Sequence, residues 1–132
     1  MAQNIVKHVK DMVAEANREI EIIPVVDASK YFKDSHYVFV DIRDPREIQR
    51  EGTIPNSFSC PRGMLEFWID PDSPYHKDIF NQDKKYIFYC AAAGRSALAA
   101  KVAQDMGLKP VSHLEGGFAA WKKSDNPIEK KE

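Results

Sequence analysis

Cys90 stands between a short apolar segment, residues 86–89, and a run of very small residues that leads into Arg95 and Ser96. The apolar segment predicts a buried strand, and apolar positions spaced by four residues after Arg95 predict a helix. A thiol between the carboxyl end of a strand and the amino end of a helix lies where unpaired backbone N–H groups converge. These groups and the helix dipole favour an anion, so we expect them to enrich the thiolate form of Cys90. The pattern therefore predicts a reactive sulfur.

The residues after Cys90 decide between that prediction and a purely structural cysteine. A lone cysteine after an apolar strand is more often a small buried hydrophobic residue than a nucleophile. The loop side chains, however, are too small to cover the sulfur or obstruct the backbone amides: Ala91, Ala92, Ala93 and Gly94. A buried structural cysteine needs neither such a loop nor Arg95 and Ser96 at the helix start, so the nucleophile is the favoured interpretation.

The overall composition is that of one ordinary globular domain. The chain has 132 residues, of which 43% are hydrophobic and 30% charged, enough to form a hydrophobic core. A formal net charge of −1 argues against a nucleic-acid partner, which usually requires a basic excess. Two cysteines, Cys60 and Cys90, make no disulfide framework and match no common zinc pattern, which indicates a reducing compartment.

The N-terminal 20 residues predict an amphipathic helix that begins after Asn4 as N-cap. Its polar face carries both signs of charge, which favours packing on the domain over a membrane surface; a contact between two copies is the alternative. The segment is not a secretory signal, and no stretch approaches the length that spans a bilayer. We therefore expect a cytoplasmic protein without a membrane partner, either a monomer or a homodimer.

Short apolar strands alternate with helices along residues 21–127, which predicts a single α/β domain with a mainly parallel sheet. Pro45 after Asp44, with Glu47 at the third helical position, is a strong helix start. We expect strands over residues 21–26, 37–42, 86–89 and 110–114, with a short extended piece before Cys60. We expect helices over residues 27–32, 45–51, 62–68, 95–106 and 118–123. Residues 128–132 are expected to form a frayed, charged tail. Because sites in such sheets form beyond the carboxyl ends of the strands, Cys90 and the end of the 37–42 strand should share one edge.

Three motifs, in this order, resemble the rhodanese sulfurtransferase family and cover residues 25–127. They are Asp41-Ile42-Arg43 with Glu47 and the segment 52–57 (GTIPNS), the loop 90–96 (CAAAGRS), and the segment 114–121 (LEGGFAAW). The order of all three is more specific than any one motif, and residues 62–76 resemble a bacterial, single-domain subgroup. The resemblance implies a rhodanese-like fold, in which a central five-stranded, mainly parallel sheet is flanked by helices on both faces.

The resemblance also implies a reaction. The thiolate of Cys90 would attack the outer sulfur of a donor such as thiosulfate, release sulfite and carry the sulfur as a persulfide, which a thiol or cyanide acceptor then takes. No cofactor is expected beyond this covalent intermediate, and the histidines share no spacing typical of metal ligands. The residues expected to bind the anionic substrate are those of the loop and one outside it: Ala91, Ala92, Ala93, Gly94, Arg95, Ser96 and Arg62.

This chain departs from the family pattern at three positions. The family often has glycine at the positions of Ala93 and Asn56, and usually has histidine at the position of Thr53.

Two other functions stay open. One is a cysteine-dependent phosphatase or arsenate reductase, disfavoured because protein tyrosine phosphatase loops have one residue more between cysteine and arginine. The other is a non-catalytic rhodanese-like binding module, disfavoured because such modules typically lose the loop cysteine.

Roles outside the loop are predicted to be mostly structural. Asp41, Arg43 and Glu47 could form an acid–base set, but an internal ion-pair network is favoured because buried charges need partners. Cys60 could resolve the Cys90 persulfide, but a cysteine before proline in an apolar context is usually just buried.

Overall fold

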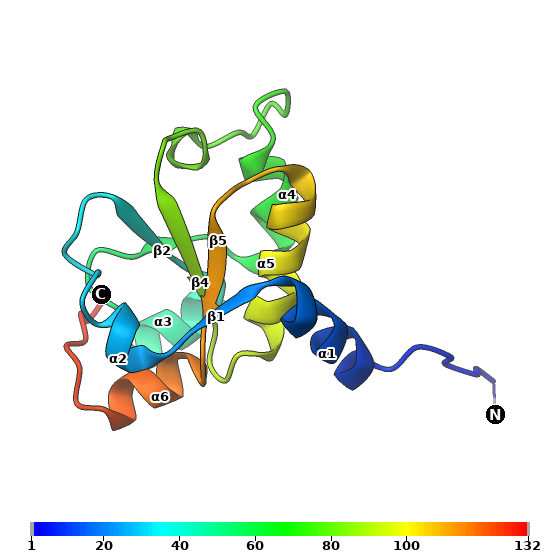
Figure 1. The fold of residues 1–132 in the computed structure, drawn as a ribbon, viewed down its shortest axis with the longest axis horizontal. Coiled ribbons are helices and arrows are strands. Elements are labelled where there is room, and N and C mark those ends of the chain that lie inside the picture. The colour runs from blue at the N-terminus through cyan, green and yellow to red at the C-terminus, as the bar shows by residue number, and fades with distance from the viewer. Residues whose placement is uncertain (1, 132) are drawn as a thin grey trace.

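A five-stranded sheet forms the centre of the computed structural model, which describes residues 2–131 (Figure 1). The strands follow the order β1-β5-β4-β2-β3 and every registered pair is parallel. Their bounds are β1 Glu21–Ile23, β2 Tyr37–Asp41, β3 Phe58–Ser59, β4 Lys85–Tyr89 and β5 Val111–Leu114. The predicted α/β fold with a five-stranded sheet is therefore confirmed, and the sheet is parallel throughout.

Helices cover both faces of the sheet (Figure 1). Helices α1, α4 and α5 lie on one face, and α2, α3 and α6 lie on the other. The α-helices are α1 Val9–Glu19, α2 Val25–Ala28, α3 Pro45–Glu51, α4 Leu65–Ile69, α5 Gly94–Met106 and α6 Gly117–Lys123, with short 3-10 turns η1 Arg62–Met64 and η2 Asp78–Phe80.

Two hydrophobic clusters, one on each face, bury the central strands completely. Tyr86 and Phe88 of β4 point into the cluster under α5, while Ile87 and Tyr89 point into the cluster that contains Trp121. All four side chains are at most 1% exposed. This two-sided burial is the reason that β4 has an uninterrupted apolar sequence instead of alternating polar and apolar residues.

Helix α3 begins as the sequence predicts. The Asp44 side chain accepts a hydrogen bond from the Arg46 backbone N–H (2.8 Å), and the Glu47 carboxylate accepts one from the Asp44 N–H (2.9 Å). This reciprocal capping box, with Pro45 as the first helical residue, satisfies amides that would otherwise lack partners.

Helix α1 begins later than predicted, at Val9 with His8 as N-cap, not after Asn4. The residues before it have nothing to pack against, since Ile5 is 64% and Val6 86% exposed. A short helical segment is stabilised mainly by packing of its apolar face, so periodicity in residues 4–8 is not enough. Helix α2, in contrast, begins two residues before the expected Asp27, at Val25, with Pro24 as its N-cap.

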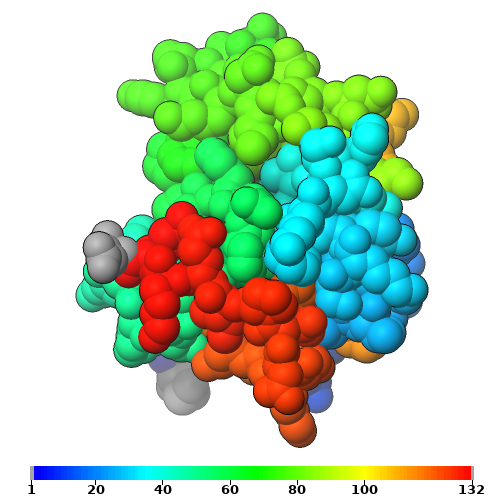
Figure 2. All heavy atoms as spheres, turned by 90° about the vertical axis from the view of Figure 1, so that its left-hand side faces the viewer, coloured from blue at the N-terminus to red at the C-terminus, as the bar shows by residue number. Residues whose placement is uncertain are grey.

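The C-terminal residues are held against the domain, whereas the sequence predicts a frayed tail. Thr53 and Glu129 form an antiparallel bridge with two backbone hydrogen bonds of 2.9 Å each. The indole N–H of Trp121 donates to the Pro127 carbonyl oxygen (2.7 Å). Figure 2 shows this segment, in red, lying flat on the surface.

Within residues 2–131, every helix is too short or too polar to cross a lipid bilayer.

Candidate active site

Cys90 follows the carboxyl end of β4, directly before the loop that begins α5. Its sulfur accepts hydrogen bonds from the backbone N–H groups of Ala93 (3.1 Å) and Ser96 (3.4 Å), and the thiol lies 3.6 Å from the Ser96 hydroxyl oxygen. Cys90 is only 1% exposed, so these donors take the place of water around the sulfur. Such an arrangement stabilises negative charge on sulfur.

The loop reaches this geometry through a left-handed backbone at Ala93, whose φ is 98°. An L-residue with a side chain in this region costs about 1–2 kcal/mol. The neighbouring Gly94 does not have a positive φ, and a Cβ atom placed on it would meet no atom within 4 Å. The loop's glycine is therefore not at the position whose conformation favours glycine. Asn56, the other position where the family often has glycine, has φ 67°.

We predict that Ala93→Gly raises the free energy of unfolding by about 1 kcal/mol, because glycine adopts the left-handed region without steric cost. Urea denaturation of the purified variant measures the effect. The matched control is the reverse change one residue later, Gly94→Ala, for which the open space around Gly94 predicts no loss of stability. An Ala93→Gly variant that is less stable than the parent protein would contradict the prediction.

The first turn of α6 holds the loop from behind. The N–H of Phe118 donates to the Cys90 carbonyl oxygen (2.8 Å), and the N–H of Ala119 donates to the Ala91 carbonyl oxygen (3.0 Å). Gly117, with φ 64°, lies so close that an added Cβ would be 2.6 Å from the Cys90 carbonyl oxygen. Sequence reasoning did not give Gly117 a role in the site; the Gly116-Gly117 pair before a helix was the available signal.

Arg95 and Glu47 form a bidentate ion pair, with both N–O distances 2.9 Å. Hydrogen bonds to the Glu47 carboxylate lower its pKa to about 2. Those from Arg95 have the largest effect, and the one from the Asp44 backbone N–H has a smaller effect. Arg95 is therefore held at the start of α5 with one edge of its guanidinium bound to Glu47, and its side chain is 45% exposed.

Arg62 pairs with a residue of its own segment. Its guanidinium donates to Glu66 (2.9 Å), in a hollow that Leu98 and Lys101 of α5 also line. Substrate binding by Arg62 and by the residues of the loop after Cys90 stays a prediction.

Asp41 and Arg43 form a completely buried ion pair at the end of β2. The guanidinium donates from Nε to Oδ1 (3.0 Å) and from Nη2 to Oδ2 (2.8 Å), and Nη2 also donates to the Gly52 carbonyl oxygen (2.7 Å). The Thr53 hydroxyl donates to Asp41 (2.8 Å). These contacts are those of the predicted structural network, although Glu47 pairs with Arg95 and not with Arg43.

The second cysteine is in a very different environment. Cys60 is 0% exposed, and burial raises the pKa of its thiol to about 12. Its thiol contacts the Pro61 carbonyl oxygen at 3.9 Å. A thiol that stays protonated is a poor nucleophile, so Cys60 has the properties of a core residue.

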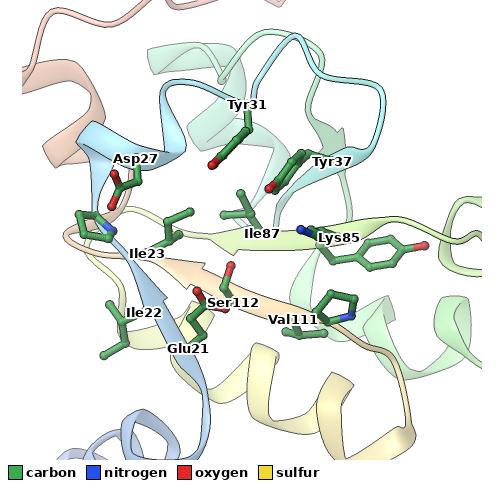
Figure 3. A pocket seen from close by; sticks show the side chains of 13 residues that line it. Glu21, Ile22, Ile23, Asp27, Tyr31, Tyr37, Lys85, Ile87, Val111 and Ser112 are labelled. Carbon is green, nitrogen blue, oxygen red and sulfur yellow. The ribbon is translucent and has the colours of Figure 1, made fainter.

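A hollow of about 380 Å³ lies at the opposite edge of the sheet, where the strands begin (Figure 3). Tyr31 and Tyr37 stack at one wall, and Lys85, Val111 and Ser112 lie along the strands beneath them. Cys90 follows the other end of β4, so this hollow is separate from the loop.

Within residues 2–131, no group of three or more His, Cys, Asp or Glu side chains is arranged to hold a metal ion.

The family model described as the rhodanese-like domain matches residues 25–124. This chain belongs to the rhodanese-like family. The match includes the whole sheet except β1, together with Cys90 and its loop, while α1 lies outside it.

Other proteins resemble this rhodanese-like chain along most of its length. "Putative sulfurtransferase YtwF" of Bacillus subtilis is 29% identical over 107 residues, which are 81% of this chain and 94% of that protein. A Rhodopseudomonas palustris protein of unknown function, described as a possible tyrosine phosphatase, is 62% identical with a TM-score of 0.95 and covers 98% of this chain and 99% of its own. The polysulfide-sulfur transferase homodimer of Wolinella succinogenes is 26% identical with a TM-score of 0.70 and covers 92% of this chain and 87% of its own.

Proposed function

We propose that this rhodanese-like protein is a sulfurtransferase that carries sulfane sulfur as a persulfide on Cys90. The observation that carries the proposal is the sulfur of Cys90 surrounded by the N–H groups of Ala93 and Ser96 at 3.1 and 3.4 Å. These dipoles face the atom on which negative charge resides before attack, and they need no rearrangement to stabilise it. The relatives named as sulfur transferases support the same class of reaction.

In the proposed reaction, the Cys90 thiolate attacks the outer sulfur of an anionic donor such as thiosulfate. An S–S bond to Cys90 forms while the donor's own S–S bond breaks, and sulfite leaves with the bonding electron pair. A thiol or cyanide acceptor then attacks the outer sulfur of the persulfide and regenerates the thiolate. No electron is supplied from outside and no cofactor is needed.

The direct test is thiocyanate production from thiosulfate and cyanide, together with the mass of the protein after thiosulfate alone. The parent protein should form thiocyanate and gain the mass of one sulfur on Cys90, and Cys90→Ser should do neither. The matched control, Cys60→Ala, should keep both properties because the Cys60 thiol stays protonated in the core. A parent protein without the added sulfur would refute the proposal and favour the non-catalytic binding module.

A phosphatase is the second candidate because the Rhodopseudomonas palustris relative is described as a possible one. Two features disfavour it: only four residues separate Cys90 from Arg95, and the Arg95 guanidinium is bound to Glu47. Hydrolysis of an aryl phosphate by the same preparations distinguishes the two activities. Cys90-dependent hydrolysis faster than sulfur transfer would replace our proposal.

A further inference from the structure

A line of hydrogen-bonding side chains runs from Cys90 into helix α1. The Cys90 thiol faces the Ser96 hydroxyl oxygen at 3.6 Å, the Ser96 oxygen lies 3.1 Å from Nδ1 of His113, and Nε2 of His113 lies 2.7 Å from Oδ1 of Asn17. Ser96 is 0% and His113 1% exposed. Cys90 follows β4, and the other three residues come from α5, β5 and α1, so only the folded domain brings them together.

The chemistry of Asn17 sets the direction of these hydrogen bonds. The amide oxygen of Asn17 can only accept, so the proton of neutral His113 is on Nε2 and Nδ1 carries a free lone pair. The Ser96 hydroxyl oxygen lies 3.3 Å from the Ala93 carbonyl oxygen and 3.1 Å from Nδ1. With a lone pair on Nδ1, the hydroxyl donates to the closer Nδ1 and can accept the thiol proton of Cys90. A histidine oriented through its second nitrogen by an asparagine is the same arrangement that activates cysteine nucleophiles in some proteases.

His113 is in the correct state to accept a proton. Burial lowers its pKa, and burial alone accounts for the shift, so the imidazole is neutral near pH 7. Its register neighbours are apolar, Ile22 on β1 and Phe88 on β4. Several charged side chains on α1 and α5 are in ion pairs of their own: Glu15 with Lys7, Glu19 and Asp105 with Lys101, and Arg95 with Glu47. The other charged residues of α1, Lys10, Asp11 and Arg18, are exposed to solvent.

We infer that His113, oriented by Asn17, accepts the Cys90 proton through Ser96 when the thiolate forms. The thiol proton moves to the Ser96 oxygen while the Ser96 hydroxyl proton moves to Nδ1 of His113. One S–H and one O–H bond break, one O–H and one N–H bond form, and a thiolate and an imidazolium result. The imidazolium then donates to Ser96, whose hydroxyl is turned toward the sulfur and stabilises the thiolate.

His113 and Asn17 are positioning residues in this scheme, since neither touches the sulfur. Asn17 belongs to α1, which lies outside the part of the chain that matches the rhodanese-like domain model. The inference thus gives α1 a role in the site in addition to its packing against α5.

The inference rests on the proposed function, but its test does not require sulfur transfer. The ultraviolet absorbance of the thiolate is titrated for each variant, and the titration of the same variant with Cys90→Ser is subtracted. Asn17→Asp keeps the shape of the side chain and adds a carboxylate beside Nε2, where it stabilises the imidazolium. We expect it to lower the midpoint pH of Cys90 thiolate formation by about one unit.

A purely structural role predicts the opposite sign, because a carboxylate near a thiolate repels it and raises the midpoint. An unchanged or raised midpoint in Asn17→Asp therefore overturns the inference. As a second variant, His113→Gln cannot accept the proton. His113→Gln should raise the midpoint pH of Cys90 thiolate formation. In the double variant with Asn17→Asp and His113→Gln, the added carboxylate should no longer lower this midpoint. If it still does, the inference is also overturned.

Failure of the relay and failure of the proposed function give different results. A protein with the expected thiolate titration but without added sulfur after thiosulfate would refute sulfur transfer alone. A protein that gains sulfur but whose midpoint ignores Asn17→Asp would refute the relay alone.

Discussion

Replacing Arg43 with methionine is expected to lower the free energy of unfolding by about 3–5 kcal/mol, the cost typical of removing one partner from a buried ion pair. The carboxylate of Asp41 is 0% exposed and would lose the two guanidinium hydrogen bonds of 2.8 and 3.0 Å that offset its desolvation. The Gly52 carbonyl would lose a donor as well. Methionine retains most of the apolar length, so the loss is mainly electrostatic.

Urea denaturation of Arg43→Met measures this loss, and Arg46→Met is the matched control. Arg46 forms an ion pair with Asp44 at 3.3 Å, but its side chain is 86% exposed, so its removal should cost less than about 1 kcal/mol. The double variant Asp41→Asn with Arg43→Met should lose less stability than the two single variants summed, because it leaves no unpaired buried charge. Equal losses for Arg43→Met and Arg46→Met would refute this account.

The same ion pair also connects to the loop that follows Cys90. The Arg43 guanidinium carbon lies 4.2 Å from the centre of the Phe118 ring, and the Phe118 backbone N–H holds the Cys90 carbonyl. Disruption at Arg43 is therefore expected to disturb the loop in addition to the fold.

The second large effect is expected from Gly117→Ala. The added methyl group would lie 2.6 Å from the Cys90 carbonyl oxygen and 2.8 Å from the Ala91 carbonyl carbon, which no real Cβ tolerates. These are backbone atoms of the loop, so the loop itself must move. A displacement of about 1 Å at a reacting group can cost about 100-fold in rate, and we expect a loss of this size in persulfide formation on Cys90.

The rate of sulfur gain by mass spectrometry measures this effect. Gly63→Ala is the matched control, because a Cβ there meets no atom within 4 Å and the rate should be unchanged. Circular dichroism shows whether Gly117→Ala is folded when its rate is measured. A folded Gly117→Ala protein with the parent rate would show that the loop does not depend on contact with α6.

Much of the fold follows from sequence patterns that act over a few residues. The strand before Cys90, the capping box of Asp44 and Glu47, and the end of α5 at Gly107, which has φ 109°, are all predictable. Each depends on burial of a short apolar run or on a hydrogen bond between residues at most four apart. The placement of Cys90 beyond the carboxyl end of a parallel strand follows from the same alternation of strands and helices.

The residues around Cys90 that come from distant parts of the chain are visible only in the folded protein. The sequence predicts that Arg95 binds an anionic substrate, yet its guanidinium forms an ion pair with Glu47, which is 48 residues away in the chain. His113 and Asn17, 96 residues apart, meet behind Ser96, and Gly117 lies against the loop it supports. The amino acid sequence is enough to predict the parallel α/β framework and the position of Cys90 at the end of a strand, because both depend on local periodicity and capping. The surroundings of the sulfur depend on contacts between separate elements, and such contacts leave no periodic signal in the sequence.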